Sequence, residues 1–386
     1  MIKTTLKNGI ELVYIPVKSF YSSVAIGVRS GYSYDPESDV GVTHLYEHIF
    51  TAMLSRLFDY GNKIEKSGFS QNASTYNGAM IVYFEHYGTE VLKILKLFKK
   101  NIENFMVGAK DFDIEKESVK NEISDWNKDY ETAFSTYLKK VGFKQTRNKR
   151  FETQKSINKL KVFHLLREHD NIFSYGNVVV VLYGKIPKKE YMKIRTLLES
   201  IELKKRHETK RFYLGDHNTL HKRNDTGVLL FHVENPTFND FLCEQIYKNT
   251  MVEYDDSILY NLLRNKERLS YGASYDDIDG VGERIFYFYF TFKDKLALKK
   301  IMRNFKSHQK IFKHDKKLFE KGKRRTLIEF YKNSLDQSDF VVDLAYYYLL
   351  YGEVLDINKI RKRLSSIKYD DYDKWIRKLT YKRLIV

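Results

Sequence analysis

Residues 42–58 read VTHLYEHIFTAMLSRLF and lie between two groups of predicted β-strands. Apolar residues recur here at intervals of three and four, which predicts an amphipathic helix capped by Asp39. Before it, residues 10–17 and 22–29 are rich in β-branched and aromatic residues and predict two strands paired with each other. A sheet followed at once by a helix therefore begins the fold.

The chain after this helix predicts a hairpin and then more helices. Residues 70–76 and 80–87 read as strands joined near Asn77-Gly78, a strong hairpin signal. Further patterns predict helices at 89–106, 111–129 and 160–168 and a buried strand at 177–184.

A similar order follows residues 201–212, whose dense charge suits an interdomain linker. We predict one domain over residues 1–200 and a second, related domain over 213–386. The expected elements of the second domain are strands at 227–233, 270–277 and 284–293 and helices at 239–248, 255–266, 295–311, 316–333, 336–351 and 356–365. Strands and helices without strict alternation predict the α+β class, with two domains that each pack helices on a mostly antiparallel sheet.

Composition narrows the class of protein. The 386 residues are 42% hydrophobic and 30% charged, which indicates a folded chain, and the net charge of +17 favours anionic partners. The single cysteine, Cys243, excludes an intramolecular disulfide, and we expect it to be a small buried hydrophobe. We predict that the chain has neither an export signal nor a membrane span. We also predict a cytoplasmic location.

His44 and His48 stand four residues apart on the predicted helix, with Glu47 beside them. Residues at this spacing share one helix face, so both imidazoles can bind one zinc ion. The plain alternative is an amphipathic helix with a polar, solvated face. A catalytic zinc also needs a third protein ligand. Glu115 and Glu122, seven residues apart on the helix at 111–129, are both candidates, and their spacing does not rank them.

With these residues in place, the sequence resembles the pitrilysin or insulinase-like zinc peptidases, whose motif is His-x-x-Glu-His. The resemblance implies that His44, His48 and Glu122 bind one Zn²⁺ and that Glu47 is the general base. It also implies that Glu115, seven residues before the third ligand, supports the catalytic site.

Two further segments extend the resemblance. Residues 68–75 resemble the family's Asn-Ala-x-Thr strand, which implies that Asn72 and Ala73 lie on a sheet edge that pairs with substrate backbone. Arg264 and Tyr271 resemble an Arg and Tyr pair that holds substrate carbonyl groups, with catalytic as well as binding roles. By themselves, these residues would be an ordinary hairpin strand, a surface arginine and a half-buried tyrosine.

The resemblance implies hydrolysis of short unfolded peptides in a chamber of which this chain forms one clamshell half. A related peptidase chain, or a second copy of this one, would complete the chamber as a heterodimer or homodimer. The His-Leu-Tyr-Glu-His form of the motif and the Lys- and Tyr-rich composition resemble those of subunits of bacterial bacteriocin-maturation peptidases.

Two alternatives stay open from the sequence. The chain could be a catalytically silent structural or substrate-presenting subunit of such a dimer. The basic runs at 147–150 and 321–325 suggest nucleic-acid binding, but no nucleic-acid motif accompanies them, so we expect solvated helix faces or loops.

Overall fold

A computed structural model describes residues 1–59, 68–87, 90–126, 128–142, 152–205, 226–266, 268, 270, 272–292, 296, 299, 316–354 and 356–386. The chain divides into two compact units, each assembled from three stretches of sequence. Unit 1 contains residues 1–129, 146–217 and 334–354, and unit 2 contains residues 130–145, 218–333 and 355–386. Most of the predicted linker, residues 206–212, lies outside the described residues, as do the basic run at 147–150 and the helix predicted at 295–311 apart from Leu296 and Lys299.

Unit 1 is built on a six-stranded sheet with the order β1-β2-β6-β3-β5-β4. Only the pairing of β2 with β6 is parallel, so the sheet is mostly antiparallel, as predicted. The strands are β1 (Ile2–Thr5), β2 (Glu11–Pro16), β3 (Tyr21–Val28), β4 (Phe69–Thr75), β5 (Met80–Tyr87) and β6 (Val178–Gly184).

The prediction that the strands at 10–17 and 22–29 pair with each other is wrong, because β6 lies between β2 and β3. Residues Val178 to Leu182 of β6 are all buried, which requires cover on both faces of the sheet. A central position gives this strand that cover. The predicted hairpin at 70–87 is confirmed by the antiparallel pairing of β4 with β5.

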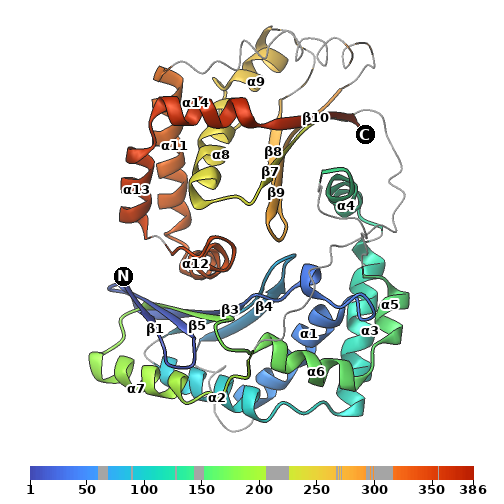
Figure 1. Cartoon of the computed structure of the whole chain (residues 1–386), viewed down its shortest axis with the longest axis vertical. Coiled ribbons are helices and arrows are strands. Elements are labelled where there is room, and N and C mark those ends of the chain that lie inside the picture. The colour runs from blue at the N-terminus through green and yellow to red at the C-terminus, as the bar shows by residue number, and fades with distance from the viewer. Residues whose placement is uncertain are drawn as a thin grey trace. The chain divides into compact units, whose positions relative to one another are not determined.

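Helices cover both faces of the unit 1 sheet (Figure 1). One face carries α1 (Val42–Asp59), α2 (Val91–Glu103), α3 (Ala109–Trp126), α6 (Val162–Ile172) and α7 (Lys188–Glu199), and α5 (Gln154–Lys159) packs against α3. The opposite face is covered by α12 (Gln337–Tyr351), which arrives from the second half of the sequence. The short helix η1 (Tyr32–Tyr34) precedes α1.

Unit 2 repeats this plan on a smaller sheet with the order β10-β7-β9-β8. The order corresponds to β6-β3-β5-β4 of unit 1, and a helix follows the second strand in both units. The strands are β7 (Thr226–Glu234), β8 (Ser274–Asp279), β9 (Glu283–Thr291) and β10 (Thr380–Ile385). This repetition confirms an α+β fold of two related domains.

The helices of unit 2 also come from distant stretches. They are α4 (Tyr130–Gly142), α8 (Phe238–Met251), α9 (Ile258–Tyr260), the π-helical turn η3 (Asn261–Lys266), α11 (Lys316–Asn333), α13 (Ile357–Ser366) and α14 (Tyr369–Lys378). Phe134 and Leu138 of α4 join the core on one face of the sheet. Each unit therefore receives one covering helix from the sequence half that forms the other unit. Among the described helices, none has the length and apolarity needed to cross a bilayer.

Candidate metal centre

The start of α1 is fixed by a buried carboxylate. Asp35 accepts hydrogen bonds from the Gly41 backbone N–H at 2.6 Å and from the backbone N–H and hydroxyl of Thr43 at 3.1 and 2.6 Å. Burial raises the pKa of Asp35 to about 8, against the opposing effect of these hydrogen bonds. The bonds satisfy N–H groups that the first turn of a helix cannot pair internally, so the turn that carries His44 is anchored.

Helix α1 has apolar residues on one face and the two histidines on another. Leu45 and Ile49 are buried in the core of unit 1. His44 and His48 lie on another face with their ring centroids 4.9 Å apart, as the spacing of four predicts. The helix therefore presents two imidazoles to the same neighbour, α3.

Helix α3 packs against α1 and supplies the acidic side of the site. Its buried residues Val119 and Ile123 hold it to the core. Glu115, Glu122 and Trp126 follow one another at intervals of seven and four, so they share a face directed at α1. The Trp126 ring stacks on His44 with a centroid distance of 5.4 Å and an interplanar angle of 12°.

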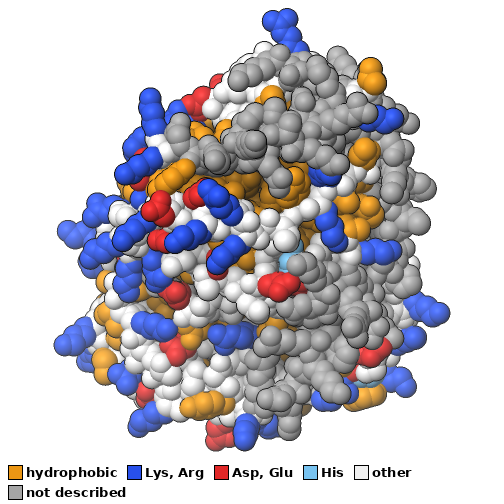
Figure 2. Space-filling view, turned by 45° about the horizontal axis from the view of Figure 1, so that its top comes forward, with side chains coloured by type: hydrophobic (Ala, Val, Ile, Leu, Met, Phe, Trp, Pro, Cys, Tyr) orange, Lys and Arg blue, Asp and Glu red, His pale blue; other side chains and the backbone are white. Residues whose placement is uncertain are grey.

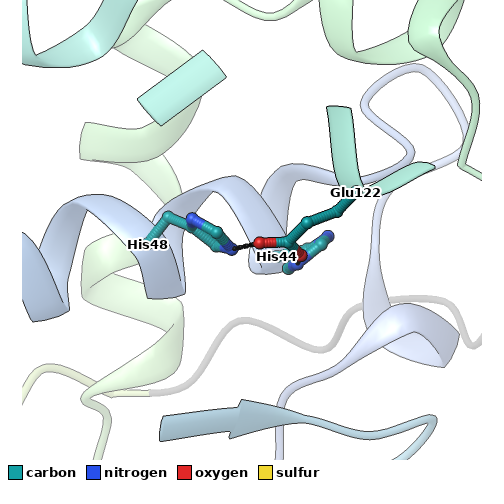
Figure 3. Close-up of side chains that lie close together, drawn as sticks. All are labelled: His44, His48 and Glu122. Carbon is teal, nitrogen blue, oxygen red and sulfur yellow. Dashed lines mark ion pairs between the residues drawn. The ribbon is translucent and has the colours of Figure 1, made fainter. Parts of the chain in front are cut away.

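Glu122 lies between the two imidazoles (Figure 3). Its carboxylate oxygens are each 3.4 Å from a histidine Nε2, one from His44 and one from His48. The three candidate ligand atoms all lie within 4.8 Å of one another. Two imidazole nitrogens and a carboxylate oxygen match the donor set of a catalytic zinc site, and the half-exposed Glu122 leaves one side open. The residues present therefore fit Zn²⁺.

The remaining ring nitrogens also face carboxylates. Nδ1 of His44 lies 3.1 and 3.2 Å from the two oxygens of Glu152, and Nδ1 of His48 lies 3.4 Å from Glu115. Burial alone would lower the pKa of His44, but Glu152 and Glu122 outweigh it and raise the pKa to about 10. The surroundings of this ring thus stabilise positive charge. The geometry separates the two glutamates that spacing left unranked: Glu122 faces both Nε2 atoms, and Glu115 faces only one Nδ1 atom.

Glu47 is held by the neighbouring sheet edge. The hydroxyl of Thr75, the last residue of β4, donates a hydrogen bond of 3.0 Å to its carboxylate. Burial raises the pKa of Glu47 above its ordinary value, although His44, His48 and Thr75 oppose the rise. A carboxylate with a raised pKa is suited to accept and return a proton near neutral pH.

The predicted substrate strand lies in the same unit. Strand β4 carries Asn72 and Ala73 and forms an edge of the described sheet, since it pairs only with β5. Asn72 is exposed and lies opposite Tyr83, whereas Thr75 faces α1. Among the described residues the strand thus has an edge without a strand partner next to Glu47, and on it the Ala73 N–H donates a hydrogen bond of 2.8 Å to the Asn72 side chain.

The predicted Arg264 and Tyr271 pair belongs to unit 2. Arg264 is exposed on η3, where it lies over the ring of Tyr260 and donates a hydrogen bond to the Tyr260 hydroxyl. Tyr271 lies outside the described residues. The structure thus brings together the five predicted residues of α1 and α3 and the strand β4, all within unit 1.

Three residues of the site were missed by the sequence analysis. Thr75 belongs to the Asn-Ala-x-Thr segment, so its position there could have drawn attention to it. Trp126 continues the α3 stripe of Glu115 and Glu122 by four residues, which is also a readable signal. Glu152 follows Glu122 by thirty positions, and no local pattern connects it with α1.

Comparison with known proteins settles the family. Residues 14–153 match the family described as Insulinase (Peptidase family M16), and residues 160–326 match the one described as Peptidase M16 inactive domain. The chain belongs to the M16 peptidases. The family is one of metallopeptidases and also contains inactive members, and M16 proteins typically bind zinc. The match spans both units, in agreement with the resemblance found in the sequence.

Solved structures share the complete fold. A protease from Helicobacter pylori is 17% identical with a TM-score of 0.76, and the alignment covers 98% of this chain and 96% of that one. A putative M16-like peptidase from Alicyclobacillus acidocaldarius is 13% identical with a TM-score of 0.79, covering 100% and 97%. The M16 inactive domain from Pseudomonas fluorescens is 14% identical with a TM-score of 0.74, covering 99% and 97%. No curated protein matches the sequence.

Proposed function

We propose that this M16 protein is a zinc-dependent endopeptidase that hydrolyses short, unfolded peptides. The observation that carries the proposal is the convergence of His44, His48 and Glu122, with Glu47 beside them. Zn²⁺ would supply Lewis acidity, polarising a scissile carbonyl and lowering the pKa of water.

The residues of unit 1 supply the remaining steps. Glu47 takes the proton of the attacking water and delivers it to the leaving amine, and the hydrogen bond from Thr75 fixes the position of its carboxylate. Strand β4 offers an extended peptide an edge without a strand partner in the described sheet. The peptide would pair with it through main-chain hydrogen bonds, with little demand on its side chains. In unit 2, Arg264 and Tyr271 are proposed to hold substrate carbonyl groups.

The first test measures metal and cleavage together. Purified protein should contain about one zinc per chain and cleave unstructured peptides, while Glu47→Gln should retain zinc and lose cleavage. Glu117→Gln is the matched control, because Glu117 is an exposed residue of α3 that pairs with Lys120 at 2.6 Å. Processing that continues unchanged in Glu47→Gln would show that another chain performs the catalysis.

A second candidate is a catalytically silent subunit that presents substrate to a related peptidase. The match of residues 160–326 to a domain described as inactive favours it. Mixing the chain with a related peptidase distinguishes the two functions. If the chain is a silent subunit, the wild type and Glu47→Gln should bind peptide equally well and should enhance cleavage by the partner to the same extent.

We also propose a peptide-processing partnership, with a related M16 chain as heterodimer partner or a second copy as homodimer partner. The finer proposal, a bacteriocin precursor as substrate, rests on the resemblance of the sequence to AlbE of subtilosin maturation. The charge distribution supports an acidic partner or peptide: unit 2 has 35 Lys and Arg against 21 Asp and Glu, or +14, whereas unit 1 has 32 against 29, or +3. Raising the salt concentration should therefore weaken assembly or peptide capture.

Among the residues that the structure describes, the basic side chains do not favour nucleic-acid binding. Within the basic run at 321–325, Lys321 and Arg325 both pair with Asp256, and Lys323 donates to the Ile367 carbonyl at 3.1 Å. Figure 2 shows Lys and Arg side chains spread over the visible surface, with Asp and Glu among them. A duplex-binding surface would instead gather unpaired cations into a stripe.

A further inference from the structure

We propose that Glu152 is a positioning residue for the metal centre: it holds the His44 ring so that Nε2 is directed at the ion. The inference rests on the zinc function proposed above. Glu152 would not bind the metal itself, since its carboxylate approaches the opposite nitrogen of the ring. Such outer carboxylates orient a ligand histidine and leave the lone pair of the other nitrogen for the metal.

Both carboxylate oxygens of Glu152 lie close to Nδ1 of His44, and the contact is shielded from water. Nδ1 of His44 lies 3.1 Å from one oxygen of Glu152 and 3.2 Å from the other, a geometry that suits an N–H donating to the carboxylate. The exposed fractions of the two side chains are only 4% and 7%. A hydrogen bond between an N–H and a carboxylate is stronger than a neutral one, and little water competes for it here.

Neighbouring aromatic rings fix the plane of the His44 imidazole but not which of its two nitrogens faces Glu122. Trp126 stacks on its face, and Tyr32 meets it edge-on at a centroid distance of 5.9 Å with an angle of 81°. These contacts define the plane of the imidazole. They do not decide which nitrogen points toward Glu122, because a flipped ring has nearly the same shape. The charge of Glu152 decides it by attracting the N–H.

The backbone around Glu152 is built to deliver its carboxylate. Thr153 caps α5 by accepting a hydrogen bond of 3.0 Å from the Ser156 backbone, and the Ser156 hydroxyl accepts one of 2.8 Å from the Thr153 backbone. Gly41 leaves the necessary room, since a Cβ there would lie 3.1 Å from the Glu152 carboxylate and 2.4 Å from Ile157. Its φ of +91° also favours glycine.

Glu115 provides an internal comparison on the other ligand histidine. It lies 3.4 Å from Nδ1 of His48, and its side chain is 19% exposed. The longer distance and the easier access of water make this the weaker interaction. We therefore expect removal of Glu152 to harm the metal centre more than removal of Glu115.

The test uses the full-length protein and two readouts. In metal-free protein, NMR should show a slowly exchanging Nδ1–H proton, assigned to His44 by its loss in His44→Gln. Glu152→Ala should lose this proton and bind zinc about 10–100-fold more weakly in a chelator competition. Glu152→Gln, which conserves shape and one acceptor oxygen, should show a smaller loss of affinity and guards against misfolding of the alanine variant.

Glu168→Gln is the matched control, because Glu168 is a buried carboxylate of unit 1 that bonds to Arg167 and Asn171 instead of a ligand histidine. It should bind zinc as the wild type does. Wild-type zinc affinity in a folded Glu152→Ala, or persistence of the His44 proton in that variant, would overturn the proposal. A wild-type protein that shows the proton but binds no zinc would refute the zinc function and leave the Glu152–His44 contact standing.

Discussion

Units 1 and 2 share an order of strands and a helix in the same place, yet their polar centres differ in kind. In unit 1, α1 directs two histidines toward a glutamate of α3, and Glu122 stays half-exposed. In unit 2, α8 directs Glu244 toward an arginine of β9, and both side chains are sealed from water. The two centres differ in which group supplies the positive charge that balances their carboxylates.

Arg284 occupies the centre of the unit 2 cluster. Its guanidinium donates two hydrogen bonds of 2.8 Å to Glu244 and contacts Asp277 at 2.8 Å and also Asp279. Tyr275 donates a further hydrogen bond to Glu244. The exposed fractions of the Arg284 and Glu244 side chains are 3% and 1%.

The comparison teaches how one scaffold supports a reactive and an inert centre. Several buried carboxylates gathered in one cluster need a cation among them. In unit 2 the cation is the guanidinium of Arg284, a covalent part of the chain, whose N–H groups are directed at the carboxylates. Unit 1 has clustered carboxylates and two imidazoles with an open side, a combination that an exchangeable metal ion can complete. This contrast agrees with the description of the family that matches residues 160–326, Peptidase M16 inactive domain, a range that includes Glu244 and Arg284.

The largest effect should come from breaking the inert centre. Arg284→Met leaves Glu244, Asp277 and Asp279 without their cation, so it should lower the free energy of unfolding by about 3–5 kcal/mol. Urea denaturation measures this loss. The control Arg377→Met removes an exposed arginine paired with Asp373 at 2.8 Å and should cost less than about 1 kcal/mol. Equal costs would show that the Arg284 cluster does not hold unit 2 together.

A pH titration sharpens the same comparison. Burial raises the pKa of Glu244 from 4.5 to about 7, while Arg284 opposes the rise and the neighbouring Asp277 adds to it. The native state therefore retains a proton that the unfolded chain releases at lower pH. This group's contribution to stability should fall as the pH rises from about 4.5 to 7, by up to about 3 kcal/mol. Unfolding from pH 4 to pH 8 should show a steeper fall of stability in the wild type than in Glu244→Gln, where buried Asp35, whose pKa is also raised, still contributes. A parallel slope in the two proteins would contradict the prediction.

Zinc should act on unit 1 alone. At a free concentration a hundredfold above its dissociation constant, zinc should stabilise the native protein by about 2.7 kcal/mol. Calorimetry of protein stripped by a chelator and then reconstituted measures this gain. Glu122→Gln should lose most of it, whereas Glu117→Gln should retain it. A gain that survives Glu122→Gln would move the metal site elsewhere.

The smallest predicted effect concerns the general base. Thr75→Val removes one hydrogen bond to Glu47, so cleavage should slow by a factor corresponding to about 1 kcal/mol while zinc is retained. Thr51→Val is the control, because the Thr51 hydroxyl bonds at 2.7 Å to the backbone carbonyl of Glu47 and leaves its carboxylate untouched. If the two variants lose the same activity, Thr75 does not act through the carboxylate.

Local patterns predicted most of the elements. The helix at 42–58 appears as α1, and those at 316–333, 336–351 and 356–365 appear as α11, α12 and α13. Helices α4, α5 and α14 and strands β1 and β10 were not predicted. The two strands are largely exposed along their lengths, so they lack the apolar pattern of the buried strands. The helix predicted at 255–266 is divided into α9 and η3.

The sequence by itself determined the grouping of His44, Glu47 and His48, because a spacing of three or four residues on a helix requires a shared face. It also determined the repeated order of elements that marks two related domains. Tertiary structure alone decided that β6 enters between β2 and β3, that α4 and α12 each cover a sheet formed mainly by the other half of the sequence, and that Glu152 reaches His44. These contacts join residues tens to hundreds of positions apart, and only the packing of complete cores brings such residues together.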